Sequence, residues 1–243
     1  MTSHPGWGRH PTSLWQPGAL YADHYAVLID KPIDDRSPLL ATVYVGFVNP
    51  ATEQAGRFPI AAYDGEGNEV MEPFLGHVAI SPLSQPALAE FALSATKTVT
   101  IGTQFGGVIQ LSQVGLPTAV APEASDTFTV TLLWDAIGTP ATDYTAFVHF
   151  IDDRGERAAG FDQAPAIRFP TSYWRSGDRI VSTFAVPTPS IDNPNGYAVW
   201  VGFYVADSGG AVRLPVTDAA GQVAGDGQVL VQEQYRLPVA DKE

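Results

Sequence analysis

The chain lacks cysteine, and it is poor in charged residues, above all in basic ones. No cysteine among its 243 residues means no disulfide, no thiol nucleophile and no cysteine metal site. Only 16% of the residues are charged, and 13 Lys and Arg stand against 26 Asp and Glu, which gives a net charge of −13. A surface of that sign repels phosphate backbones and anionic lipid headgroups. We therefore expect neither nucleic-acid binding nor electrostatic docking on a membrane.

Long hydrophobic runs are missing as well. The longest apolar stretches, residues 41–48 and 197–205, have the length of strands, whereas a transmembrane helix needs about 20 apolar residues. The first ten residues contain no apolar segment of the kind found in a signal peptide. Export or membrane attachment would therefore depend on segments outside this sequence.

The residues that are present favour short extended elements. With 23 glycines and 20 prolines the chain is rich in turn formers. Polar and apolar residues alternate over residues 127–134 and 144–151, which is typical of half-buried strands. Similar β-branched and aromatic runs occupy residues 108–111, 179–186, 197–205 and 229–231. The sequence predicts an all-β fold, an antiparallel β-sandwich of immunoglobulin-like or jelly-roll type, with one or two helical turns at residues 87–94.

Four stretches near the N-terminus recur later in the same order. The motif Pro-Thr-Ser-x-Trp-x-x-Gly occupies residues 11–18 and, 159 positions later, residues 170–177. The other matches pair residues 44–47 with 200–203, 57–60 with 213–216, and 64–67 with 218–221. We interpret residues 1–82 as the second half of a repeat, residues 83–99 as a linker, and residues 100–240 as the complete unit.

The partial copy has a physical consequence. Half of a sandwich cannot close its own core, so a chain without its front strands is a better interpretation than an unequal duplication. An unpaired sheet edge would then invite association with other chains. We expect self-association unless the partial unit packs on the complete one.

Aromatic residues of the repeated motif are the first candidate binding residues. Trp15, Trp174 and the neighbouring Tyr173 lie at loop positions. Flat indole rings there can stack on the apolar faces of sugars, or they can close one end of the sandwich, because tryptophan is usually highly buried. Recurrence in both copies favours the structural alternative for the two tryptophans.

Other chemistry-bearing residues form no known motif. His149 is a weak binding candidate, because it alternates with Val148 and Phe150 and so points to the opposite sheet face, where a solvent-facing or hydrogen-bonded histidine is the ordinary case. The five histidines do not have the spacing of a zinc site, and the acidic turns at residues 34–35, 152–156 and 192 lack the regular carboxylates of a calcium loop. No nucleophile motif or nucleotide fingerprint is present. We expect no metal, no cofactor and no catalytic residue, although Asp143 or Asp178 could join a carboxylate pair of a glycoside-acting enzyme.

The repeated motif, the run Tyr-x-Val-Trp-Val-Gly-Phe-Tyr at residues 197–204 and the run Arg-Leu-Pro-Val-Thr-Asp-x-x-Gly at residues 213–221 together resemble a known module. It is the β-rich module of large bacterial membrane proteins similar to glycosyltransferases of the dolichyl-phosphate-mannose type, many from Chloroflexi-like bacteria. Residues 143–149 are similar to one of its strands. The resemblance implies a module that follows membrane helices, faces outside the cytoplasm and carries no known catalytic residue.

Two roles follow for such a module. The first is a non-catalytic extracytoplasmic accessory that binds a glycan or a lipid-linked sugar, which the aromatic content of 11% favours. The second is a structural spacer or protein–protein interaction module of the cell envelope. The second predicts buried tryptophans and no concave aromatic face. An enzyme that acts on glycosides is the remaining alternative.

Overall fold

The computed structural model describes residues 12–22, 27, 38–46, 62–64, 66–70, 74–80, 97–118, 126–190, 193–207, 209–218, 220 and 222–237. The chain divides into two compact units, residues 1–33 and 34–243. In the first unit the described element is a single 3-10 turn, η2 (Thr12–Leu14). The second unit holds every described strand.

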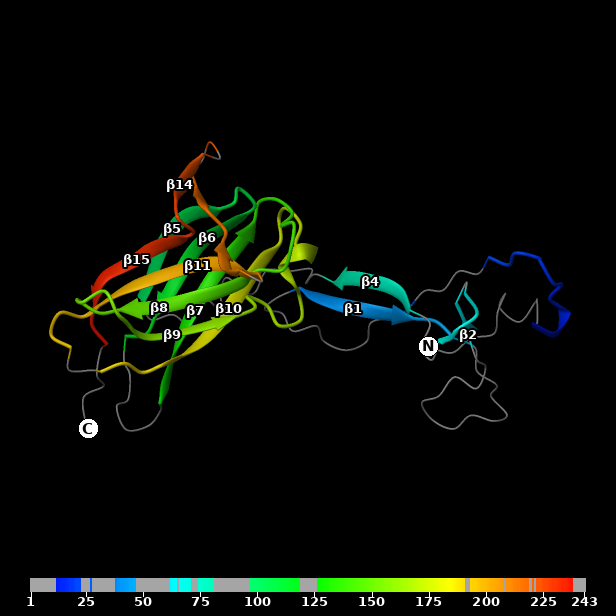
Figure 1. Cartoon of the computed structure of the whole chain (residues 1–243), viewed down its shortest axis with the longest axis horizontal. Coiled ribbons are helices and arrows are strands. Elements are labelled where there is room, and N and C mark those ends of the chain that lie inside the picture. Colours follow the sequence, from blue (N-terminus) through cyan, green and yellow to red (C-terminus); the bar gives the residue numbers. More distant parts are fainter. Residues whose placement is uncertain are drawn as a thin grey trace. The chain divides into compact units, whose positions relative to one another are not determined.

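Two antiparallel sheets form a β-sandwich in the second unit (Figure 1). The first has the order β10-β7-β6-β5-β13-β14, with bounds Arg179–Pro187, Thr127–Ala136, Ile109–Leu116, Lys97–Phe105, Val216–Thr217 and Val223–Gly225. The second has the order β12-β11-β8-β9, with bounds Gly210–Arg213, Tyr197–Asp207, Thr145–Ile151 and Arg157–Gln163, and β15 (Gln228–Tyr235) pairs with β11. The predicted all-β sandwich is confirmed.

Side chains from the two sheets meet in one core. On β7 the alternate residues Phe128, Val130, Leu132 and Trp134 belong to this core, as the period-2 pattern predicts. The Trp134 and Phe203 rings lie 4.6 Å apart, centre to centre, and join the first sheet to the second. Burial of this apolar surface is the main stabilising contribution to the sandwich.

The sandwich begins earlier than expected. Strand β5 starts at Lys97, so residues 97–99 are not part of the predicted linker 83–99. They form a strand because the half-buried Val99 and Ile101 alternate with exposed threonines and pack against the core. The predicted helical turn at residues 87–94, like the rest of the linker, lies outside the described residues.

Two further strand pairs stand outside both sheets. Strands β1 (Leu39–Tyr44) and β4 (Phe74–Ile80) form one antiparallel pair, and β2 (Ala62–Tyr63) and β3 (Glu69–Val70) form the other. The Leu40 amide donates to the Arg168 carbonyl oxygen at 2.8 Å, and the Leu40 side chain packs against the sandwich core. These contacts explain why the β1–β4 pair belongs to the second compact unit, although the sequence placed it in a separate unit 1–82.

The repeated motif has the same backbone in both places. Each copy forms a 3-10 turn, η2 and η3 (Thr171–Tyr173), and each tryptophan amide donates to the carbonyl oxygen of the threonine three residues earlier, at 3.1 Å for Trp15 and 3.0 Å for Trp174. Each motif ends in a glycine with positive φ, +80° at Gly18 and +98° at Gly177. Only glycine adopts such a φ at little cost, which accounts for its place in the motif.

The β1–β4 pair repeats the register of the β11–β15 pair. Val43 lies opposite Gly76 and Tyr44 opposite Phe74, with an irregularity between them. Exactly the same arrangement recurs 156 positions later on both strands, where Val199 lies opposite Gln232 and Trp200 opposite Leu230. We therefore treat β1 as the counterpart of β11 and β4 as the counterpart of β15.

The small hairpins between these strands also correspond. In β2–β3, Asp64 Oδ1 accepts hydrogen bonds of 2.9 Å from the amides of Glu66 and Asn68. In the β13–β14 hairpin, Asp218 Oδ1 accepts bonds of 2.9 Å from the amides two and four residues later. In each turn the carboxylate accepts hydrogen bonds from backbone amides that have no partner in the short strands, and this stabilises the turn.

Candidate functional site

Trp174 is a structural residue of the sandwich. Its side chain is fully buried, and its indole Nε1–H donates to the carbonyl oxygen of Phe169 at 3.0 Å. The preceding Thr171 fixes the loop, because its hydroxyl donates to the Thr142 carbonyl oxygen and accepts from the Tyr144 amide, both at 2.8 Å. A buried ring offers no face to a sugar, so the geometry of Trp174 fits the structural alternative that the repeat favoured and not its weak candidacy as a binding residue.

The two carboxylates considered for glycoside chemistry support the same loop. Asp143 Oδ1 accepts a hydrogen bond of 3.0 Å from the Ser172 amide, and Asp178 Oδ2 accepts one of 2.8 Å from the Arg175 amide. Each therefore caps a backbone donor on one side of Trp174. These contacts give both residues a role in the scaffold.

Trp15 has a different environment from its counterpart. In the first unit its ring stacks on Tyr21, with ring centres 4.6 Å apart and planes 10° apart. Trp15 is half-buried, and 39% of the Tyr21 surface is exposed. The two tryptophans thus share a backbone conformation but not a degree of burial.

Tyr173 leads to a row of aromatic rings on the β1–β4 pair. The ring of Tyr173 lies 5.6 Å from that of His77, His77 lies 5.0 Å from Phe74, and Phe74 lies 6.1 Å from Tyr44. The successive planes are inclined by 85°, 56° and 62°. We call these four residues the aromatic row. Such inclined contacts, two edge to face and one tilted, are typical of rings that pack together and do not form a flat platform.

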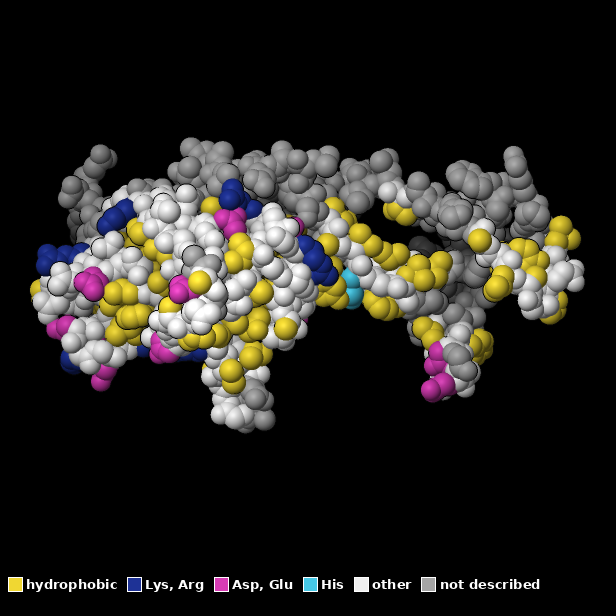
Figure 2. Space-filling view, turned by 90° about the horizontal axis from the view of Figure 1, so that it is seen from above, with side chains coloured by type: hydrophobic (Ala, Val, Ile, Leu, Met, Phe, Trp, Pro, Cys, Tyr) yellow, Lys and Arg dark blue, Asp and Glu magenta, His cyan; other side chains and the backbone are white. Residues whose placement is uncertain are grey.

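The aromatic row reaches the surface. Tyr44 is 49% exposed and Phe74 is 54% exposed. His77 is exposed as well, while Tyr173 is half-buried. In Figure 2 hydrophobic side chains lie along the β1–β4 pair.

Apolar residues of the same pair lack the cover that their counterparts have. Val45 is 45% exposed, whereas its counterpart Val201 is fully buried. Leu75 is 67% exposed, whereas its counterpart Val231 is 8% exposed. Val78, opposite Ala41, is 52% exposed, and its counterpart Gln234 is exposed as well. At Val45, just after β1, and at Leu75 the chain therefore exposes aliphatic side chains whose equivalents the complete unit buries. Trp200 and Leu230, the equivalents of Tyr44 and Phe74, are half-buried.

His149 lies in a polar cluster on the outer face of the second sheet. Its Nε2 is 2.9 Å from Asp162 Oδ1, and that oxygen also accepts a hydrogen bond of 3.0 Å from Arg157 Nη2. The imidazole stacks on Phe147 at 4.4 Å, and the guanidinium of Arg213 lies 5.6 Å from the Phe147 ring centre. His149 is thus a hydrogen-bonded histidine on the face that the alternation predicts.

The charge state of this cluster is set mainly by burial. Desolvation lowers the pKa of His149 below its usual value, the hydrogen bond to Asp162 opposes this, and Arg157 adds to it. Burial together with the charge of Asp162 raises the pKa of Tyr204, which faces the same carboxylate. At neutral pH we therefore expect a neutral imidazole. Among the described residues no group of three or more His, Cys, Asp or Glu is placed to hold a metal ion.

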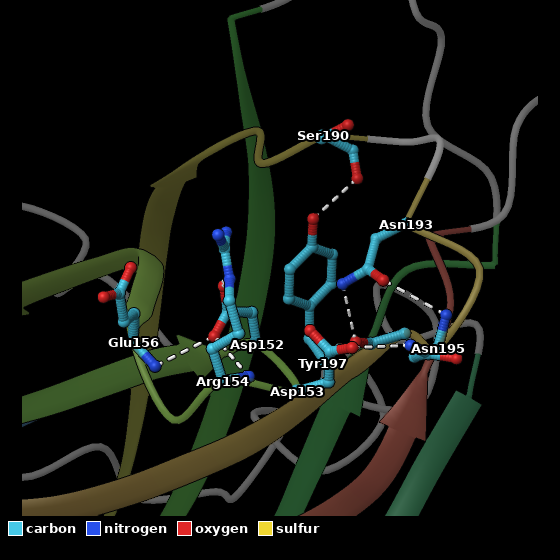
Figure 3. A network of polar contacts seen from close by, with 9 residues as sticks. Asp152, Asp153, Arg154, Glu156, Ser190, Asn193, Asn195 and Tyr197 are labelled. Atoms are coloured by element: carbon cyan, nitrogen blue, oxygen red, sulfur yellow. Dashed lines mark hydrogen bonds and ion pairs between the residues drawn. The ribbon is translucent and has the colours of Figure 1, made fainter.

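The acidic turn at residues 152–156 uses its oxygens internally (Figure 3). Asp152 Oδ1 accepts bonds of 2.9 Å from the amides of Arg154 and Glu156, and these bonds lower the pKa of Asp152, the one from Glu156 most. Asp153 Oδ2 accepts a bond of 2.6 Å from Asn195 Nδ2 and so ties this turn to the loop before β11. The turn is structural. The acidic residues 34, 35 and 192 lie outside the described residues.

Comparison with known proteins assigns no family to the chain and no function to these residues. No family model, no curated protein and no solved structure matches the chain. Among the described residues no helix has the length and apolar character to cross a bilayer.

The three predicted binding residues of the second unit do not form one site. Tyr173 belongs to the aromatic row, Trp174 to the core, His149 to the outer sheet face, and Trp15 to the first unit. Sequence reasoning missed the row because its rings come from residues 44, 74, 77 and 173, which only the pairing of β1 with β4 and their contact with η3 bring together. The one sequence signal was the match of residues 44–47 to a buried strand of the complete unit.

Proposed function

We propose that this chain is a non-catalytic interaction module of the cell envelope, which binds another protein through the β1–β4 pair. The observation that carries the proposal is the exposure of Val45 and Leu75, whose counterparts Val201 and Val231 are buried in the complete unit. The β1–β4 pair also exposes Tyr44 and Phe74, and several large apolar side chains exposed on one element are typical of interaction sites. Placement outside the cytoplasm, beside a glycosyltransferase-type membrane protein, is supported by the sequence resemblance.

The aromatic row favours a protein over a sugar as the ligand of this surface. A pyranose ring stacks best on an aromatic ring whose whole face is open. In the row the Tyr44–Phe74 and His77–Tyr173 contacts are edge to face and the Phe74–His77 contact is tilted. Side chains of a partner protein can extend such an arrangement. Trp174 is buried, and Asp143 and Asp178 accept hydrogen bonds from backbone amides of the same loop. These three residues therefore stabilise the sandwich loops and are not offered to a ligand.

Site-specific photocrosslinking in the host cell tests this function. A photoreactive phenylalanine analogue at Tyr44 or Phe74 should give a discrete protein adduct. The same analogue at Val223, which is 72% exposed on a different hairpin, should give none. Equal labelling at the three positions, or no protein adduct at Tyr44 and Phe74, contradicts the proposal.

Glycan binding is a second candidate, carried by the Trp15–Tyr21 stack. The two rings are nearly parallel and 39% of the Tyr21 surface is exposed, so the exposed side of Tyr21 can receive a sugar or a lipid-linked sugar. Glycan-array binding that disappears in Trp15→Ala, with an unchanged circular dichroism spectrum, would support it. An array without any hit for the intact chain would exclude it.

A further inference from the structure

The complete unit shows what lies beside a strand of the β1 type. Strand β11 has β15 on one edge and β8 on the other. Along the β8 edge Val199 lies opposite Phe150, Trp200 opposite His149 and Val201 opposite Val148. The inward residues of β8, which are Ala146, Val148 and Phe150, are fully buried.

Strand β1 has a partner on one edge alone among the described strands. That partner is β4, the counterpart of β15. On the other edge the Leu40 amide donates to the Arg168 carbonyl oxygen, so this amide points away from β4. Because alternate residues of an antiparallel strand face the same edge, the Thr42 backbone groups also point there. Beyond Leu40 no described strand pairs with this edge.

We propose that residues 42–46 accept an antiparallel strand from a partner polypeptide, in the place that β8 occupies beside β11. The proposal rests on the protein-binding function proposed above and names the mode of binding. Strand addition of this kind gains affinity from main-chain hydrogen bonds and specificity from alternate side chains.

The register of the complete unit defines the chemistry of the partner strand. A residue like Phe150 would lie opposite Val43 and one like Val148 opposite Val45, with the residue between them facing Tyr44. The partner strand therefore has β-branched or aromatic residues at alternate positions, directed to the side of Val43 and Val45. A polar or aromatic residue stands between them.

A second copy of this chain is not the occupant that the structure favours. In each copy β8 is already paired on both edges, with β11 and with β9. To donate it, a copy would have to open its own buried core. The partner that we infer is therefore a polypeptide whose β8-like strand is not already held in a closed sandwich.

The absence of cysteine allows a direct test by disulfide trapping. The probe is a synthetic peptide with the sequence of residues 143–153, in which the position of His149 carries cysteine. The peptide thiol is activated as a mixed disulfide with 2-nitro-5-thiobenzoate, and the thiolate of the full chain carrying Tyr44→Cys displaces the thionitrobenzoate. We expect a disulfide to form about tenfold or more faster than with the control Val223→Cys, because a docked strand raises the local thiol concentration. Cysteine at the neighbouring peptide positions 148 or 150 should react more slowly.

Strand addition is overturned if the disulfide forms equally fast with Tyr44→Cys and Val223→Cys, or equally fast at all three cysteine positions of the peptide. It is also overturned if aspartate in place of Val148 and Phe150 of the peptide does not slow disulfide formation. Homodimers of Tyr44→Cys formed in place of the peptide adduct would assign the edge to a second copy and also overturn it. Protein adducts at Tyr44 in the cell without peptide trapping would leave the protein-binding function standing and remove strand addition alone.

Discussion

The Trp174 indole donates its Nε1–H to the carbonyl oxygen of Phe169, 3.0 Å away, in the interior of the sandwich. Both side chains are fully buried. The contact lies within one loop, so the hydrogen bond holds the loop closed while the ring fills the core beneath it. This residue pair gives the tryptophan of the Pro-Thr-Ser-x-Trp motif a structural role in the sandwich.

We expect Trp174→Ala to lower the free energy of unfolding by about 3–5 kcal/mol, because it removes a buried indole and leaves a cavity. Urea unfolding followed by circular dichroism measures the change. The matched variant Trp15→Ala should cost much less, since Trp15 is only half-buried. A comparable loss in the two variants would show that the first copy of the motif is as tightly packed as the second.

Ser182 links two buried groups. It accepts the Trp134 Nε1–H at 2.9 Å and donates its own hydroxyl hydrogen to the Pro165 carbonyl oxygen. Ser182→Ala leaves a buried indole N–H without a partner, and we expect it to cost about 1–3 kcal/mol in urea unfolding. Thr183→Ala on the exposed face of the same strand is the control and should change stability little. If the two variants are equally stable, the Ser182 hydroxyl contributes nothing to the core.

The strands of the sandwich were largely predictable because each buries one face. Alternation at residues 127–134 and 144–151 marks β7 and β8, whose inward residues include Trp134 and Phe150. Strand β9 gave a weaker signal. Its sequence contains Ala158, Ala159 and Gly160, residues of low strand propensity, and it forms because β8 pairs with it.

Long-range contacts were not predictable from the pattern. His149 meets Asp162 because β8 and β9 pair in one register out of several that their alternation allows. The contact of His77 with Tyr173 depends on the β1–β4 pair lying beside η3. The repeat indicated that residues 44–47 derive from a buried strand, but exposure of Val45 follows from the absence of a covering strand among the described residues.

Gly202 is a position where a side chain does not fit. A Cβ there would lie 2.3 Å from the Gly227 carbonyl oxygen and 2.5 Å from Phe147 Cζ. We expect Gly202→Ala to force β11 away from β15 and to cost about 1–3 kcal/mol, as overpacking does. Gly209 has nothing within 4 Å of the same atom, so Gly209→Ala is the matched control and should be nearly neutral. Thermal unfolding of the two variants checks this, and a neutral Gly202→Ala would mean that β11 and β15 separate easily.

His149 makes stability depend on pH near neutrality. Its pKa in the folded chain lies below the ordinary value of about 6.5 because burial disfavours the imidazolium. The unfolded chain then binds more protons than the folded chain between these two values, so stability rises with pH in this window and is constant above about 6.5. His149→Gln should remove this part of the pH dependence, whereas His77→Gln, at an exposed ring, should keep it. Urea midpoints measured from pH 5 to 8 give the comparison. A wild-type chain that gains stability on acidification, with the gain lost in His149→Gln, would mean that the attraction of Asp162 outweighs burial and that the shift has the opposite sign.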